Sequence, residues 1–168
     1  MNEGQRRFSV TLFVLYWVLA TVLTSLHELG HAALPLARGI SVRTDLGATN
    51  GLEIRLGKWV LALGSLTNPW FGSTHYSKLA AADELVVLMA GPLVSLVCAS
   101  VGLLVFQKIK NTPHRKARAL ALFTFWYAFI QALFTLVPLT YPDWLGGFGS
   151  KPSDGMRILE LLQNPPPG

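Results

Sequence analysis

Two histidines and a glutamate near the start of the chain have the spacing of a metal-dependent hydrolase. Residues 27–31 read His27-Glu28-Leu29-Gly30-His31, an HExxH pattern. Positions i and i+4 share one face of an α-helix, so both imidazoles can be directed at one metal ion. Glu28 is offset by one residue and can reach a water bound to that ion. Two neutral imidazoles suit Zn²⁺, which prefers a four-coordinate shell. The alternative is a pair of buried histidines that donate to backbone carbonyls.

The composition places this motif in a membrane protein. Only 14% of the 168 residues are charged and 51% are hydrophobic, against about 25% charged residues in soluble domains. The mean hydropathy is +0.42. Residues 8–26, 85–106 and 119–142 are free of charge. Each run is close to or above the ~20 residues that cross a bilayer as a helix. We therefore expect a mainly α, polytopic membrane protein with three transmembrane helices, at about 8–38, 84–107 and 118–141, in a single domain over 1–168.

A signal peptide is the alternative reading of the first run. Its apolar stretch is longer than the usual 7–15 residues, and no small-residue cleavage site follows it. The second run carries Gly91, Ser95 and Ala99 at four-residue spacing. This stripe of small residues predicts close helix packing rather than chemistry.

The hydrophobic period changes after the first span. Apolar residues alternate with others through residues 40–66, and Asn50-Gly51 is typical of a type I′ turn. We expect two or three short strands there, with a hairpin at Asn50-Gly51, forming a small membrane-associated β-hairpin or sheet; a plain loop is the alternative. Residues 67–80 are expected to be irregular chain at the membrane interface. Near the end, Ser153 or Asp154 can cap a short helix over about 154–163.

The zinc shell needs a third protein ligand, with water in the fourth position. His27 lies near the far end of the first span, and two further spans return the chain to the same side. Candidates on that side are Asp143 and Asp154, together with Asp45, Glu53, Asp83 and Glu84 of the first connection. Asp154 is preferred because a helix start holds its carboxylate and Gly155 permits close backbone approach. Asp143 is the next candidate.

On these residues the chain resembles the site-2 protease family, the intramembrane zinc metalloproteases of the M50 type. The matching pieces are residues 27–31 in the first span, 90–95 (AGPLVS) in the second, and 136–138 (LVP) and 153–159 (SDGMRIL) around the end of the third. The resemblance implies that His27, His31 and Asp154 bind zinc, that Glu28 is the catalytic carboxylate, and that the sheet receives substrate. Three features depart from the family pattern, one of which is that the segment after Asp154 is too short and polar to form the family's fourth helix. Thr135 stands where the family usually has Asn, and the stretch from Pro138 to Asp154 is long, whereas a shorter form would put Asp143 at the ligand position.

The expected function is a zinc-dependent intramembrane endopeptidase that hydrolyses peptide bonds of transmembrane or membrane-proximal substrates. Zinc would lower the pKa of its water toward about 7, and Glu28 would take the proton. A strand edge in residues 40–66 would hold the unwound substrate by β-addition. One alternative is a catalytically inactive M50-like membrane protein that binds metal or partner helices. Another is a small metal-handling membrane protein, for which a stripe of ligands along a pore would be expected.

The expected partners are a transmembrane protein substrate and the lipid bilayer. The net charge of +5 suits anionic headgroups better than nucleic acid, because neither a basic helix nor an aromatic platform is seen. We expect a multi-pass integral protein of the cell membrane. The basic loop 108–118 favours a cytosolic position for that loop, whereas the resemblance implies a zinc site nearer the cytosol. The sequence leaves orientation and oligomeric state open.

Overall fold

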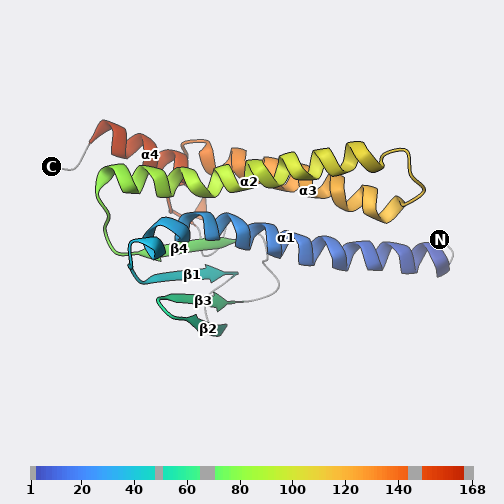
Figure 1. Ribbon diagram of the computed structural model, residues 1–168, viewed down its shortest axis with the longest axis horizontal. Helices are drawn as coiled ribbons and strands as arrows, with labels where there is room; N and C mark the ends of the chain where they lie inside the picture. Colours follow the sequence, from blue (N-terminus) through green and yellow to red (C-terminus); the bar gives the residue numbers. More distant parts are fainter. Residues whose placement is uncertain (1–2, 48–50, 65–70, 144–148, 165–168) are drawn as a thin grey trace.

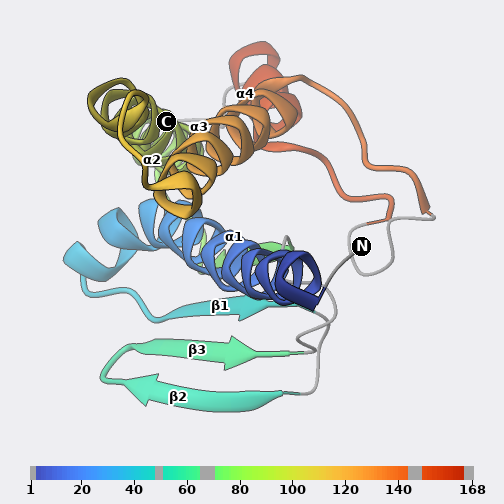
Figure 2. The same cartoon turned by 90° about the vertical axis from the view of Figure 1, so that its right-hand side faces the viewer.

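The computed structural model describes residues 3–47, 51–64, 71–143 and 149–164. These residues form four α-helices and four strands (Figure 1). They are α1 (Glu3–Ala37), β1 (Val42–Leu46), β2 (Leu52–Leu56), β3 (Trp59–Leu63), β4 (Gly72–Tyr76), α2 (Ala81–Ile109), α3 (Arg115–Leu136) and α4 (Asp154–Gln163). The sheet lies on one side of α1, and α2, α3 and α4 lie on the other (Figure 2).

Three helices are long and apolar enough to cross a membrane, over Ser9–Ala37, Ala81–Ile109 and Arg115–Leu136. The first two agree with the predicted helices to within a few residues. The prediction for the third was too long, because α3 ends at Leu136 rather than near residue 141. Val137 is extended (ψ 122°) since the ring of Pro138 disfavours the α conformation at the preceding residue.

Small residues allow the long helices to approach closely. A Cβ atom on Gly30 of α1 would lie 2.8 Å from the carbonyl oxygen of Ala90 in α2, and one on Gly102 would lie 2.7 Å from the backbone nitrogen of Phe125 in α3. Gly91, Ser95 and Ala99 are all buried, as the small-residue stripe predicted. Large apolar side chains remain on the outer surfaces of all three helices, for example Phe13, Val97 and Leu133. Such surfaces suit a lipid environment.

The sheet has the strand order β2-β3-β1-β4, in which β1 runs parallel to β3 and antiparallel to β4. Three strands lie within residues 40–66, where two or three were predicted, but the predicted hairpin at Asn50-Gly51 is wrong. Asn50 lies outside the described residues, and the strands on either side of it, β1 and β2, are not neighbours. The hairpin joins β2 to β3 through Gly57 and Lys58. Gly57 has φ 62°, which suits the first loop position of a type II′ turn.

The expectation of irregular chain over residues 67–80 is also wrong, because β4 forms at residues 72–76. Its sequence, Gly72-Ser73-Thr74-His75-Tyr76, has no apolar alternation. The strand is held by its antiparallel pairing with β1 and by contact with α1, where Thr74 donates to the backbone oxygen of Glu28 at 3.3 Å. Tertiary contacts rather than strand propensity form this element.

The predicted short helix after the third span is confirmed as α4. Ser153 is its N-cap, and the Ser153 hydroxyl accepts a hydrogen bond from the backbone nitrogen of Met156 at 3.1 Å. The same hydroxyl donates to the carbonyl of Val137 at 2.7 Å, which fixes the start of α4 against the end of α3.

Candidate metal centre

Three side chains that the sequence singled out converge on one point. His27 and His31 come from α1, Asp154 is the first residue of α4, and one ligand atom from each lies within 4.8 Å of the others. The two Nε2 atoms are 3.2 Å apart, and Oδ2 of Asp154 is 3.3 Å from His31 Nε2 and 3.8 Å from His27 Nε2. Ligands bonded at about 2.0–2.1 Å to a tetrahedral zinc ion stand ~3.3 Å apart. The spacing therefore suits a single ion.

The partners of the other ring nitrogens determine where the protons lie. His31 Nδ1 is 2.8 Å from the carbonyl of Val87, which can only accept, so Nδ1 carries the hydrogen. His27 Nδ1 is 2.8 Å from the hydroxyl of Ser95, and that hydroxyl donates to Oε1 of Gln131 at 3.1 Å. Ser95 therefore accepts from Nδ1 of His27. In the neutral rings, both Nε2 atoms present lone pairs toward each other and toward the carboxylate.

Three acceptors that face one another in a buried place are stabilised by a cation between them, either a proton on one imidazole or a metal ion. His27 and His31 are only 2% and 7% exposed. Metal-binding histidines usually donate a hydrogen bond from Nδ1 to an oxygen, which leaves Nε2 turned toward the ion. The donor set and its surroundings therefore suit zinc.

Two glycines allow this convergence. A Cβ atom on Gly91 would collide with the imidazole of His31, and one on Gly155 would collide with the carbonyl of Leu136. Gly91 therefore makes room for one ligand, and Gly155 lets the start of α4, with Asp154, approach the end of α3.

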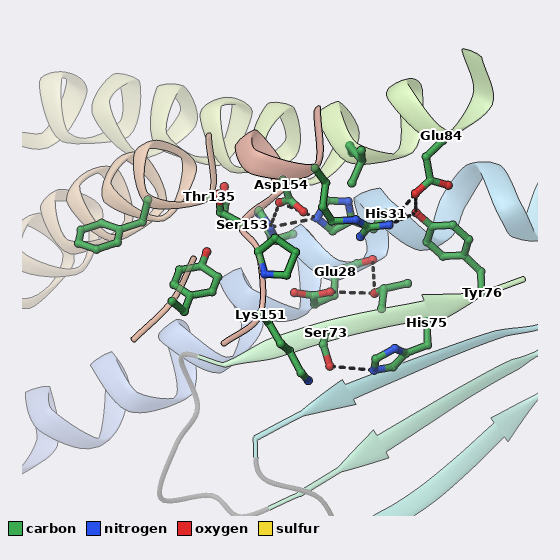
Figure 3. A pocket seen from close by; sticks show the side chains of 18 of the residues that line it. Glu28, His31, Ser73, His75, Tyr76, Glu84, Thr135, Lys151, Ser153 and Asp154 are labelled. Atoms are coloured by element: carbon green, nitrogen blue, oxygen red, sulfur yellow. Dashed lines mark hydrogen bonds and ion pairs between the residues drawn. The ribbon is translucent and has the colours of Figure 1, made fainter. Parts of the chain in front are cut away.

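Glu28 is buried beside this cluster but is not one of its three ligands. Its Oε2 accepts a hydrogen bond from the hydroxyl of Thr74 at 2.8 Å, and a Cβ atom on Gly72 would collide with the Glu28 side chain. Strand β4 therefore positions the carboxylate (Figure 3). Glu28 lines the same cavity as both histidines, so its carboxylate can reach a molecule bound there.

The cavity has a volume of about 1320 Å³ and contains all four predicted site residues. Strand β4 and helices α1, α2, α3 and α4 all contribute to its lining. The lining includes apolar side chains, among them Leu88, Ile130 and Phe134, as well as the two histidines and Asp154. The volume exceeds the ~300–1,000 Å³ of a typical small-molecule pocket.

The electrostatics of the cavity keep Asp154 ionised. Burial raises the pKa of Asp154, but hydrogen bonds from His27 and His31, which form when an Nε2 atom carries a proton, outweigh burial and hold the pKa well below its usual range. Tyr141, which also lines the cavity, has its pKa raised to about 12 by burial and by the negative charges of Asp154 and Glu28. The phenol therefore keeps its proton at neutral pH.

The other acidic candidates are engaged elsewhere. Asp143 is exposed and accepts a hydrogen bond from Ser150 at 2.5 Å. The four acids of the first connection each contact a basic side chain; the pairs are Asp45 and Glu53 with Arg43, Asp83 with Arg38, and Glu84 with Arg157. Among the described residues, Asp154 is the acid that joins the two histidines in a possible metal-binding group.

Several residues in or beside the cavity were not foreseen from the sequence. Ser95 was assigned to packing, yet it also orients His27. Gln131 is a single amide in an otherwise apolar run, a signal that a polar partner is needed inside the bundle. Thr74 carried no signal, because its role depends on a strand that pairing creates.

In comparisons with protein-family models, curated proteins and solved structures, nothing matched this chain. A function for this chain is therefore inferred from the geometry of the site.

Proposed function

We propose that the chain is a zinc-dependent intramembrane endopeptidase of the site-2 protease type. The observation that carries this proposal is the convergence of the His27 and His31 lone pairs with the Asp154 carboxylate. Glu28 lines the same cavity without being one of the three ligands. A second carboxylate beside a three-ligand site is the arrangement of a hydrolase, since one acid completes the ligand set while another can move protons.

Each residue has a distinct task in this proposal. His27, His31 and Asp154 would hold the ion, which supplies a water that ionises near pH 7 and a positive charge for the developing oxyanion. Glu28 takes the proton from the attacking water and later gives it to the leaving amine. Thr74 donates to Oε2 of Glu28 and so fixes the orientation of that carboxylate.

The substrate strand is expected to add to β4 rather than to an edge within residues 40–66. Strand β4 is an edge of the sheet, and its residues 72–76 all line the cavity. A transmembrane helix satisfies its carbonyls internally, so a segment must unwind before it is cut. The free backbone groups of an edge strand can pair with that segment. This supports cleavage of transmembrane or membrane-proximal peptide bonds by a multi-pass protein of the cell membrane.

Metal analysis of the purified full chain tests the proposal. Wild type and Asp143→Ala are expected to retain about one zinc per chain, whereas His27→Ala and Asp154→Ala lose most of it. Cleavage of a transmembrane peptide should follow zinc content. Wild-type protein without stoichiometric zinc would contradict the metal site. Bound zinc without cleavage of any transmembrane peptide would instead favour the inactive, metal-binding alternative.

A further inference from the structure

Three polar side chains from three different elements meet at one part of the cavity. Tyr76 ends β4, Glu84 lies in the first turn of α2, and Arg157 lies in the first turn of α4. Nη2 of Arg157 donates to Oε1 of Glu84 at 2.5 Å, and the Tyr76 hydroxyl donates to the same oxygen at 3.0 Å. Figure 3 shows Tyr76 and Glu84 joined in this way beside the metal-site residues. These three residues are called the Arg157 cluster below.

The ion pair of the Arg157 cluster is better shielded than the Arg43–Glu53 pair of the sheet. The Glu84 side chain is 19% exposed and that of Arg157 38%, whereas Arg43 and Glu53 are 45% and 38% exposed. Burial raises the pKa of Tyr76 to about 12, so its hydroxyl stays a hydrogen-bond donor. A charge-assisted bond with reduced access to water is stronger than an exposed one.

The position of Arg157 in α4 links this cluster to the metal site. Arg157 follows Asp154 by three residues, so both lie on the same side of the helix. Helix α4 has only ten residues and would not be stable alone. Its first turn is fixed by the Ser153 cap, by the close packing of Gly155 against Leu136, and by Arg157. The Ser153 cap and the Gly155 contact fix where α4 begins, and the contact of Arg157 with Glu84 fixes the direction of the helix axis.

We propose that the Arg157 cluster is a positioning device for the third metal ligand. It holds α4 against α2 and β4, so that the Asp154 carboxylate stays at the two imidazoles. The inference rests on the metal site proposed above. Because Tyr76 ends the strand along which substrate would lie, the same contacts join the substrate strand to a metal ligand.

Zinc affinity of the full chain in detergent, measured by competition with a chelator, tests this role without any protease assay. Zinc alone is the probe. Arg157→Gln and Glu84→Gln are each expected to weaken zinc binding about tenfold, as loss of an outer-shell partner does. The charge swap Arg157→Glu with Glu84→Arg should recover most of that loss. Arg43→Gln, which breaks an exposed pair on the sheet, is the matched control and should bind zinc as the wild type does.

A double-mutant comparison separates positioning from general destabilisation. In an Asp154→Ala background, Arg157→Gln should cause no further loss of zinc affinity, because its effect passes through Asp154. An equal loss in both backgrounds, or single variants within twofold of wild type, would overturn the positioning role and leave the metal site intact. Wild-type protein that binds no zinc would instead remove the proposed function and this inference together.

Discussion

At the scale of single residues, metal binding by the two imidazoles would depend on which ring nitrogen carries the hydrogen as well as on where the rings lie. Val87 and Ser95 each hold an Nδ1 hydrogen, so the Nε2 lone pairs of His31 and His27 face the same point. Gln131 fixes the direction of the Ser95 hydroxyl. Helices α2 and α3 thus orient the two imidazoles, which both come from α1.

Ser95→Ala removes the acceptor for Nδ1 of His27. We expect zinc affinity to fall roughly 10- to 100-fold, since the ring can then rotate or adopt the other tautomer. Chelator competition on the purified protein measures the change. Ser100→Ala is the control, because Ser100 lies on the same helix, is exposed and bonds only to the carbonyl of Leu96. Equal affinities for the two variants would argue against an orienting role.

Glu28→Gln tests the assigned proton carrier. The amide has nearly the same shape and can still bond to Thr74, so zinc content should stay at the wild-type level. Cleavage of a transmembrane peptide should fall by about 10²–10⁴-fold, the usual contribution of a general base. Glu53→Gln on the outer face of the sheet should leave cleavage unchanged. A Glu28→Gln protein that cuts at the wild-type rate would refute the role.

At the scale of elements, the start of α4 depends on one close backbone contact. Gly155→Ala places a Cβ atom against the carbonyl of Leu136, and both groups are backbone-anchored. We expect α4 to shift, with a loss of about 1–3 kcal/mol of stability and weaker zinc binding. Thermal unfolding with and without zinc measures both effects.

Gln163→Ala provides the matched control for this helix. Gln163 is the last residue of α4 and is exposed, so its substitution should change neither unfolding nor zinc binding. If Gly155→Ala behaved in the same way, the contact between α4 and the end of α3 would not be what places Asp154.

The helices were predictable from the sequence because their signals are local. Charge-free runs define α2 and α3, and the Ser153 cap with the polar tail defines α4. The sheet was less predictable, since β1 pairs with β3 and β4 rather than with the next strand along the chain. A turn signal at Asn50-Gly51 says nothing about such long-range pairing. Strand β4 forms because it pairs with β1 and contacts α1.

The residues of the site also divide into those with a local sequence signal and those placed by long-range contacts. His27, Glu28 and His31 follow from spacing within one helix. Asp154 followed from chain topology and from Gly155, and the structure brings it to the histidines. The contacts of Ser95 and Arg157 depend on how α2 is rotated against its neighbours, which no local pattern specifies. The sequence therefore predicted the three side chains that converge, but not the side chains that hold them in place.

At the scale of the whole molecule, the three long helices separate two ends that differ in the balance of basic and acidic side chains. The N-terminus and the connection between α2 and α3 lie at one end, and the sheet and α4 lie at the other (Figure 1). The connection region 108–118 contains five Lys or Arg residues and no acid. At the opposite end, Arg38, Arg43 and Arg157 are each paired with an acid. If the helices cross a bilayer, these ends face different compartments.

Thiol labelling of single cysteines tests this arrangement. In a Cys98→Ala background, Asn111→Cys reports on the α2–α3 connection and Ser77→Cys on the end that holds the metal site; both positions are exposed. A reagent that cannot cross membranes should label one of them in intact cells and the other only in inverted vesicles, because an impermeant probe reaches one face at a time. Labelling of both from the same side would mean that α2 does not span the bilayer. Asp154 would then have no topological reason to return to the face that carries His27 and His31, and their convergence in a membrane protease would need another explanation.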